Sequence, residues 1–254
     1  MSATTERFSQ RATAYAAARP PYPRAIAVDL KAALHLPDHA VVADLGSGTG
    51  LSSEIFLRAG CTVIGVEPNA DMRAAADAYL ASHAHHRTVA GSAEATGLPD
   101  ASVDLVIAAQ AAHWFDAPRA RREALRILRR PAHAALIWNE RESTRDAFAQ
   151  GYEQLLCDFG TDYTQVRARH ADPELIGNFF GSAVRETRYP HVLPLDENKL
   201  RALLASASYL PAAHTPQYAL MMERVHTLYE RHQQQGLVQL NYVARVFAGV
   251  VSNL

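Results

Sequence analysis

One stretch decides the fold: Val41-Val42-Ala43-Asp44-Leu45-Gly46-Ser47-Gly48-Thr49-Gly50, with Val63-Ile64-Gly65-Val66-Glu67-Pro68 following it along the chain. A short apolar strand runs into a glycine-rich turn that opens a helix, and a second apolar strand ends on a carboxylate. Strands joined through a helix in this way lie parallel in a sheet, and ligands bind at the carboxyl ends of such strands. The two segments therefore predict a nucleoside site between the glycine turn and Glu67.

The glycines of the turn have a specific use. Gly46, Gly48 and Gly50 place no side chain where the backbone must pass close to a ligand, and glycine adopts dihedral angles closed to other residues. We expect the ligand to lie against bare peptide N–H groups here, so a side chain at Gly48 should block it. Glu67 is expected to accept the hydroxyl hydrogens of a ribose, as an acidic residue does at this spacing in doubly wound folds. The alternative is an ordinary tight turn between a strand and a helix.

The spacing also indicates which nucleoside binds. In the dinucleotide pattern G-x-G-x-x-G a helix N-terminus faces a pyrophosphate, whereas the glycines here alternate with other residues. The carboxylate of Asp44 at the strand end would repel a pyrophosphate and suits a cation, such as the ammonium group of a nucleoside that carries an amino acid. The sequence therefore disfavours a nicotinamide dehydrogenase.

At these residues the chain resembles the class I S-adenosylmethionine-dependent methyltransferases, over roughly residues 5–140. The resemblance implies S-adenosylmethionine as cofactor, with Glu67 on the ribose and Pro68 and Met72 packing the adenine. Gly91-Ser92-Ala93-Glu94 matches the segment after the third strand, where the family commonly has an aspartate in place of Ser92 to accept from the adenine amino group. The implied cofactor-binding residues are Tyr15, Arg19, Asp44, Gly46, Ser47, Gly48, Gly50, Glu67, Pro68, Met72, Ser92, Ala93, Glu94 and Gln110.

A narrower resemblance is to the trans-aconitate methyltransferase-like group of small-molecule methyltransferases. It is carried by Phe8, Tyr15 and Arg19-Pro20-Pro21-Tyr22-Pro23 near the start, and by Ala112-His113-Trp114-Phe115-Asp116 after the fourth strand. It implies an N-terminal segment that folds over the cofactor as a lid, with Tyr15 and Arg19 reaching the methionine carboxylate or closing the pocket. The alternative for residues 19–23 is a stiff turn before a helix, because proline fixes its own backbone and restricts the preceding residue.

Composition limits the partners. The chain has 254 residues, of which 48% are hydrophobic, and a formal net charge of −1, so it can bury one substantial core and gives no electrostatic case for nucleic acid or a membrane. We expect a small-molecule substrate, no nucleic-acid or membrane partner, and a monomer or homodimer. Cys61 and Cys157 are too few for a disulfide framework, and the N-terminus lacks an apolar run of signal-peptide length, which predicts a cytoplasmic protein.

Hydrophobic periodicity predicts the architecture. We expect an α/β fold with a Rossmann-like, seven-stranded, mostly parallel sheet, helices on both faces and a helical cap. A single methyltransferase domain over 1–254 would contain an N-terminal lid and helix (1–36), a cofactor-binding core (37–142), helical cap insertions (143–183 and 196–234) and closing strands (184–193 and 237–251). The arginines between Asp116 and Arg130 are expected to form a solvated helix face, with contact to an acidic partner as the alternative.

The expected reaction is in-line displacement of a methyl group from the sulfonium by a small-molecule acceptor, which depends mainly on positioning and exclusion of water. His113, just past the fourth strand, is the candidate catalytic base if an acceptor proton must leave, and a structural role is its alternative. Asn139, Glu140 and Arg141 end the fifth strand, where they either contact substrate or form loop salt bridges. The candidate substrate-binding residues are Tyr22, His113, Trp114 and Asn139.

Other functions stay open from the sequence. The same cofactor could be attacked at another carbon, giving cyclisation or aminocarboxypropyl transfer, or the chain could be a cofactor-binding regulatory protein without catalysis. No metal site is expected, because the neighbouring His83, His85 and His86 have no cysteine or carboxylate at a known ligand spacing.

Overall fold

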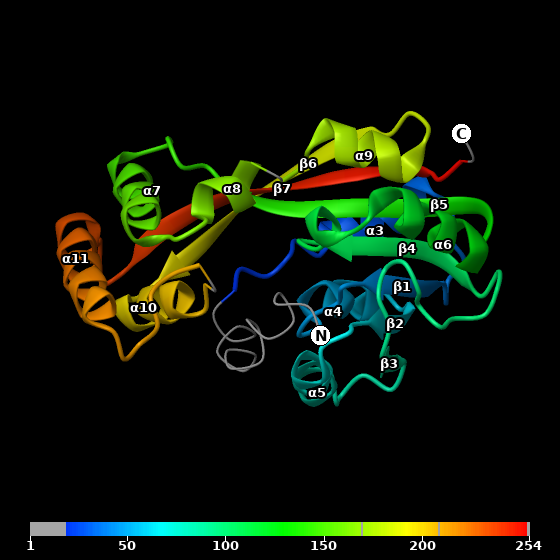
Figure 1. The fold of residues 1–254 in the computed structure, drawn as a ribbon, viewed down its shortest axis with the longest axis horizontal. Coiled ribbons are helices and arrows are strands. Elements are labelled where there is room, and N and C mark those ends of the chain that lie inside the picture. The colour runs from blue at the N-terminus through cyan, green and yellow to red at the C-terminus, as the bar shows by residue number, and fades with distance from the viewer. Residues whose placement is uncertain (1–18, 169, 208, 253–254) are drawn as a thin grey trace.

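The computed structural model describes residues 19–168, 170–207 and 209–252, and in this part of the chain seven strands form one sheet in the order β3-β2-β1-β4-β5-β7-β6 (Figure 1). The strands from β3 to β5 pair in parallel, and β7 runs antiparallel to both β5 and β6. The predicted α/β class with a mostly parallel sheet is confirmed. The bounds are β1 (Val41–Leu45), β2 (Thr62–Val66), β3 (His86–Val89), β4 (Val103–Ala109), β5 (Leu128–Arg141), β6 (Arg185–Leu195) and β7 (Val238–Val250).

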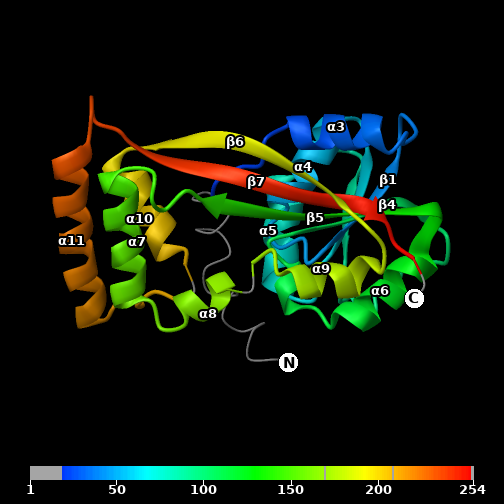
Figure 2. The ribbon, with the colours of Figure 1, turned by 90° about the horizontal axis from the view of Figure 1, so that it is seen from above.

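Helices cover both faces of the sheet (Figure 2). On one face α3 and α4 bury Ile26 and Phe56, and on the other α6 and α9 bury Ile127 and Phe179. The helix α5 packs beside the edge strand β3. The bounds are α3 (Ala25–Ala33), α4 (Leu51–Arg58), α5 (Ala70–Tyr79), the 3-10 helix η1 (Ala112–Trp114), α6 (Ala117–Ile127), α7 (Ala147–Phe159), α8 (Tyr163–Ala168), α9 (Pro173–Phe180), α10 (Glu197–Ala205) and α11 (Pro216–His232).

The central strands are buried on both sides. In β1 and β4, Val42, Ala43, Leu105, Val106 and Ile107 have no exposed surface. Strands covered by helices on two faces need apolar side chains in both directions, so their sequences are continuously apolar instead of alternating. This pattern explains why β1 and β4 were predictable from the sequence.

The last three strands carry a second hydrophobic core. β5, β6 and β7 extend beyond the centre of the sheet toward α7, α10 and α11 (Figure 2), where Tyr152, Leu200 and Met221 are buried together. These helices, with α8, form the cap over the strand ends. The helix α9 lies elsewhere, although it belongs to the segment 143–183 predicted as cap: it packs against α6 and β7 on the main sheet, because Phe179 and Phe180 complement the apolar side of α6.

One arginine of α6 departs from the expected solvated face. Arg121 is only 7% exposed, and its guanidinium donates hydrogen bonds to the backbone carbonyl of Ser252, through Nε at 2.7 Å and through Nη2. The neighbouring Arg122 and Arg126 are exposed. The segment after β7 runs against α6 and needs a donor for its carbonyl, and no local sequence pattern reveals that need.

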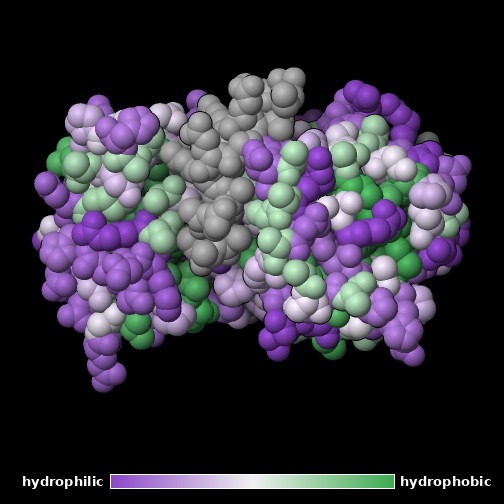
Figure 3. All heavy atoms as spheres, turned by 90° about the horizontal axis from the view of Figure 1, so that it is seen from below, coloured by the Kyte–Doolittle hydropathy of each residue, from purple (hydrophilic) through white to green (hydrophobic). Residues whose placement is uncertain are grey.

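The surface gives no indication of a membrane-spanning helix. Within residues 19–168, 170–207 and 209–252, no helix is both long and apolar enough to cross a bilayer. On the face shown in Figure 3, hydrophilic side chains spread over both ends of the molecule among smaller hydrophobic areas.

The contact between Arg121 and Ser252 gives a stability prediction. Arg121→Met should lower the free energy of unfolding by about 1–3 kcal/mol, because the partly buried carbonyl loses its donors. Arg122→Met, on the exposed side of the same helix, should change it by less than about 0.5 kcal/mol. Urea unfolding followed by circular dichroism measures both variants, and equal effects would contradict a specific role for Arg121.

Candidate active site

A cavity of about 770 Å³ lies at the carboxyl ends of β1, β2, β4 and β5 and continues under the cap. Pockets for small molecules usually measure roughly 300–1,000 Å³. We call the part lined by Gly48, Glu67 and Met72 the sheet end, and the part lined by Arg141 and Tyr209 the cap end. The cavity therefore joins the ends of the parallel strands to a wall that the cap supplies.

Most of the predicted site residues meet in this cavity. Asp44 and Gly50 do not lie on its wall, and Tyr15 and Phe8 lie outside the described residues, so the lid stays a prediction. The predicted residues on the wall are Arg19, Tyr22, Gly46, Ser47, Gly48, Glu67, Pro68, Met72, Ser92, Ala93, Glu94, Gln110, His113, Trp114 and Asn139.

The N–H groups of the glycine turn are used within the protein, contrary to the expectation of bare donors. The N–H groups of Gly46 and Ser47 donate to the Val66 carbonyl at 2.8 and 3.3 Å. The Gly48 N–H donates to Glu67 Oε2 at 3.0 Å. A pyrophosphate bound at such a turn needs free N–H donors. The turn therefore leaves room for a ligand but no free N–H groups at Gly46, Ser47 and Gly48. This disfavours a dinucleotide, as the spacing of the glycines already does.

The three glycines have different uses. Their φ angles are +67° at Gly46, +54° at Gly48 and +88° at Gly50, in the left-handed region that favours glycine. A Cβ atom at Gly48 would meet nothing within 4 Å, whereas at Gly50 it would lie 2.6 Å from Leu80 Cδ1. Gly48 is thus where a ligand can approach the backbone. Gly50, predicted to bind the cofactor, instead allows close packing against the end of α5.

Glu67 is held firmly at the end of β2. Its side chain is almost buried, and Oε2 accepts from the Gly48 N–H at 3.0 Å while Oε1 accepts from the Asn69 N–H at 2.9 Å. Burial raises the pKa of Glu67. Arg73 Nη1 donates to the carbonyls of Glu67 and Pro68 at 2.7 and 2.9 Å, which secures the turn. A carboxylate has about four acceptor positions, so Glu67 retains capacity for two ligand hydroxyls.

Asp44 is buried beneath the turn and does not face the cavity. Its Oδ2 accepts from the hydroxyls of Ser52 and Ser53 at 2.6 and 2.7 Å. Its Oδ1 is buried and has no hydrogen-bond partner in the described part of the chain. Burial raises the pKa of Asp44 to about 6, and the two serine hydrogen bonds oppose the rise. The carboxylate of Asp44 therefore acts on the cavity from below its wall, and its expected role toward a ligand cation, directly or through water, stays a prediction.

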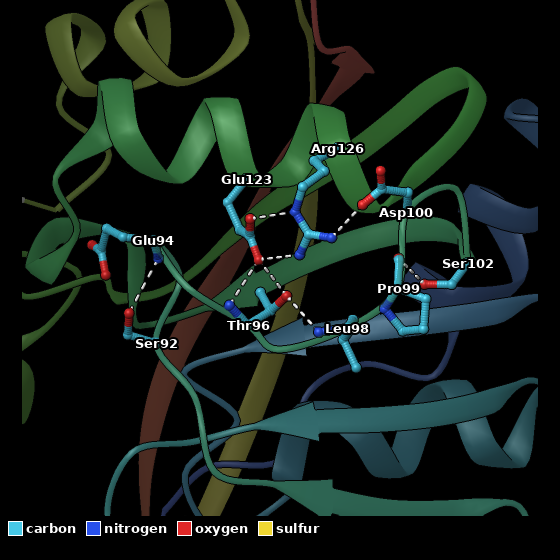
Figure 4. Close-up of polar contacts among 9 residues, drawn as sticks. All are labelled: Ser92, Glu94, Thr96, Leu98, Pro99, Asp100, Ser102, Glu123 and Arg126. Atoms are coloured by element: carbon cyan, nitrogen blue, oxygen red, sulfur yellow. Dashed lines mark hydrogen bonds and ion pairs between the residues drawn. The ribbon is translucent and has the colours of Figure 1, made fainter.

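The segment after β3 is clamped to α6 (Figure 4). Ser92 Oγ accepts from the Glu94 N–H at 3.3 Å, which closes a turn on the cavity wall. Behind it, the Glu123 carboxylate accepts from the N–H and hydroxyl of Thr96 at 2.8 and 2.6 Å. Arg126 donates to the same carboxylate at 2.8 and 2.7 Å. Side chains on a helix therefore position a loop that has little regular structure of its own.

Two amides lie near the carboxyl ends of β4 and β5: Gln110 directly follows β4, and Asn139 lies two residues before the last residue of β5. Gln110 has φ +52°, a strained conformation for a residue other than glycine, which costs on the order of 1–3 kcal/mol. Its Nε2 donates to the Asn139 carbonyl at 2.9 Å. The buried Oδ1 of Asn139 and Oε1 of Gln110 have no hydrogen-bond partner among the described residues. Strain at a cavity wall with unused acceptors is typical of a binding site, and both amides fit a ligand donor.

His113 lies where β4 passes into η1, with 9% of its surface exposed. Its ring contacts those of Trp114 and His170, with centroids 4.8 and 4.9 Å apart. Burial lowers the pKa of His170 to about 4, and the charges of Arg141, Arg167 and Arg19 add to this effect. His170 is therefore neutral at physiological pH, and its contact with His113 joins the cap to the sheet.

Most residues of the cap end were not predicted from the sequence. Arg141, for which the sequence leaves a choice between substrate contact and a salt bridge, lies on the cavity wall. The aromatic content of 143–183 was a visible signal, but local periodicity assigns such residues to a cap core. The wall residues that the sequence does not assign to the site include Tyr152, Tyr163, Arg167, His170, Tyr209 and Tyr242 at the cap end.

Comparisons with known proteins agree with this geometry. A family model for the methyltransferase domain matches residues 43–136. An uncharacterized methyltransferase of Mycobacterium tuberculosis is 33% identical over 226 residues, which cover 89% of this chain and 86% of that protein. An uncharacterized methyltransferase-like protein of Schizosaccharomyces pombe is 26% identical over 238 residues, covering 92% and 91%. A solved structure of a provisionally assigned type II methyltransferase from Anaeromyxobacter dehalogenans, with 22% identity and 93% and 99% coverage, has a TM-score of 0.68 and is similar in fold.

The Glu123 clamp predicts a pH-dependent stability. Hydrogen bonds from Arg126 lower the pKa of Glu123 from 4.5 to about 2, burial opposes this, and Thr96 adds to the lowering. A carboxyl group with a lower pKa in the folded protein stabilises it fully above the unfolded pKa, and this contribution is lost as the pH falls toward the folded pKa. Glu123→Gln should reduce the urea midpoint at neutral pH, and the difference from wild type should shrink as the pH falls from about 5 to about 3.

Urea unfolding at each pH checks this prediction. Glu142→Gln is a suitable control, because Glu142 pairs with Arg145 at the surface and away from the clamp. If the urea midpoints of wild type and Glu123→Gln differ by the same amount over the whole acidic range, the Glu123 carboxylate does not stabilise the fold through these hydrogen bonds.

Proposed function

The chain belongs to the methyltransferase family that these relatives share, and from this premise we propose that it transfers a methyl group from S-adenosylmethionine to a small-molecule acceptor in the cavity. One observation carries the proposal: a single cavity joins the turn at Gly48 and Glu67 to a chemically different end at Arg141 under the cap. A methyl donor and an acceptor must meet in one space from which water is excluded. A cavity with two distinct ends provides that arrangement.

We assign the sheet end to the cofactor. Glu67 would accept from the ribose hydroxyls, Pro68 and Met72 would pack the adenine, and the turn of Ser92 and Glu94 would lie beyond the base. Support comes from the spare acceptor positions of Glu67 and from the open space at the Gly48 Cα. The internal use of the turn's N–H groups further favours a cofactor without pyrophosphate.

The amino-acid part of the cofactor would lie toward the ends of β1 and β4. The charge of Asp44 below the wall and the unpaired Oε1 of Gln110 on the wall favour a positively charged group in this region. Arg19 also lies on the wall and suits the carboxylate of the methionine moiety. These groups would orient the amino-acid part of the cofactor, which carries no phosphate.

Methyl transfer requires the protein mainly to position the cofactor and the acceptor. S-adenosylmethionine, when bound, supplies a methyl group on a sulfonium that departs as a neutral thioether. The chain must then hold the acceptor in line and keep water out. Leu203, Tyr152 and Tyr209 of the cap and Trp114 beside η1 line the cavity and are suited to this task.

We propose His113 as the group that takes the acceptor proton when one must leave. It lies on the cavity wall, and its neighbour His170 stays neutral at physiological pH, so a proton on His113 would not face a second charged imidazole. A general base contributes only where the acceptor is protonated. An acceptor that reacts as an anion would leave His113 with a positioning role.

The cellular setting follows from the same reasoning. The described thiols of Cys61 and Cys157 are free, which suits a reducing cytoplasm. The net charge of −1 offers no steering toward nucleic acid, in keeping with a small-molecule acceptor. We therefore propose a cytoplasmic enzyme, and the monomer or homodimer state stays a prediction.

Glu67→Ala tests the cofactor assignment. The variant should bind S-adenosylhomocysteine about 1–3 kcal/mol more weakly, because the ribose hydroxyls lose their acceptor. Isothermal titration calorimetry measures the affinity, and Glu54→Ala, which removes a surface partner of Arg58, serves as the control. Unchanged affinity in the Glu67 variant would remove this residue from the cofactor site.

Product analysis tests the reaction itself. Purified protein incubated with S-adenosylmethionine and a panel of small acids, phenols and amines should release S-adenosylhomocysteine and a methylated acceptor, both identified by mass spectrometry. Release of methylthioadenosine would instead indicate attack at another carbon. His113→Ala should lower kcat by about 10²–10⁴-fold with little change in cofactor affinity if His113 is the base. An unchanged kcat assigns it a structural role.

A further inference from the structure

The cap end contains an arginine with unused hydrogen-bonding capacity. Arg141 ends β5, and its guanidinium lies 5.1 Å from the ring centroid of Tyr152 and 5.9 Å from that of Tyr163. Its Nη2 donates to Tyr163 Oη at 2.7 Å. Its Nε is buried and has no hydrogen-bond partner among the described residues. The guanidinium also has a side-chain hydrogen bond with Tyr242, but its buried Nε still leaves one donor unused by the protein.

The charges around Arg141 do not balance. The closest carboxylate is that of Glu153, whose Oε2 lies 3.6 Å from Arg141 Nη2, beyond hydrogen-bonding distance. The same carboxylate accepts from Tyr163 Oη at 2.7 and 2.8 Å and pairs with Arg167. One carboxylate thus lies between two guanidinium groups, which leaves a surplus of one positive charge.

Other acidic side chains on this part of the wall do not remove the surplus. Glu140 pairs with Arg245 at 3.3 Å. Asp162 and Arg19 also lie on the wall, carry opposite charges and have interactions of their own, so neither is counted in this surplus. The lowered pKa of His170, caused by burial and then by Arg141, Arg167 and Arg19, agrees with a positive field at this end. The tyrosines contribute hydroxyls without charge, since burial raises the pKa of Tyr152 and of Tyr242.

We propose that the cap end binds a carboxylate of the acceptor, with Arg141 as the anchoring side chain. This inference deepens the proposed function and rests on it. A guanidinium donates two parallel hydrogen bonds to a planar carboxylate, and Nε is one of the donors that this arrangement uses. The rings of Tyr152 and Tyr163 beside Arg141 limit access of water and strengthen the ion pair. The carboxylate orients the acceptor, whether or not it is the atom group that receives the methyl.

The charge count favours a carboxylate over a phosphate. A single surplus positive charge is neutralised by one monoanion, whereas a phosphate monoester carries close to two negative charges at neutral pH. A second negative charge in a partly buried site would lack a partner and would cost binding free energy. The acceptor class is therefore a small organic acid.

The test separates anion recognition from cofactor binding. Full-length protein is first titrated with S-adenosylhomocysteine, and the saturated complex is then titrated by calorimetry with acid and amide pairs: benzoate and benzamide, cinnamate and cinnamamide, hexanoate and hexanamide. At least one acid should bind about tenfold or more tightly than its amide, as expected for a hydrogen-bonded charge pair. Phenyl phosphate should bind more weakly than benzoate.

Three variants locate the preference. Arg141→Met should abolish the difference between acid and amide while S-adenosylhomocysteine affinity stays within about twofold, which also shows that the variant is folded. Arg141→Lys keeps the positive charge but cannot donate two parallel hydrogen bonds, so it should retain part of the preference for the acid over the amide. Arg145→Met removes an exposed arginine paired with Glu142 and should leave the preference intact.

The outcomes distinguish two failures. Absence of S-adenosylhomocysteine binding in the wild type overturns the proposed function and this inference with it. Normal cofactor binding with no acid preference in any pair, a preference that survives Arg141→Met, or tighter binding of phenyl phosphate overturns the carboxylate inference alone. If Arg141→Met does not fold, the comparison of acids with amides in the wild type and in Arg141→Lys decides the matter.

Discussion

The hydrogen bond from the Gly48 N–H to the Glu67 carboxylate is the interaction on which the site depends. It joins the turn after β1 to the end of β2, so the two segments that line the sheet end cannot move independently. The same bond occupies a donor that a phosphate would require, and on our proposal the remaining acceptor positions of the carboxylate take the ribose hydroxyls. One contact thus shapes the sheet end and, on our proposal, favours a nucleoside without a pyrophosphate.

The two ends of the cavity are constructed differently. The sheet end is made of backbone turns held by hydrogen bonds to neighbouring strands and, at Ser92 and Glu94, by the Glu123 clamp on α6. The cap end is made of long side chains from β5, α7, α8 and β7, brought together by a separate hydrophobic core. A family can therefore keep the first end and vary the second, which is how a constant scaffold serves many acceptors.

Charge also separates the two ends. Asp44 and Glu67 place buried negative charge at the sheet end, and Arg141 with Arg167 outnumbers Glu153 at the cap end. On our proposals the donor is a cation and the acceptor an anion, so each is attracted to the end that fits it. The charges of the two ligands would also attract each other, which favours their meeting inside the cavity.

The sequence by itself determined the parallel sheet and the sheet end of the site. Gly48 and Glu67 belong to strand-turn-helix units whose geometry is local, so the residue types and their spacing were enough to predict them. The use of the turn's N–H groups, the packing role of Gly50 and the burial of Arg121 depended on contacts with other elements. Arg141, Tyr209 and Tyr242 come from segments far apart in sequence, and only the tertiary structure brought them together, because side chains that meet through a folded cap share no periodicity that a sequence displays.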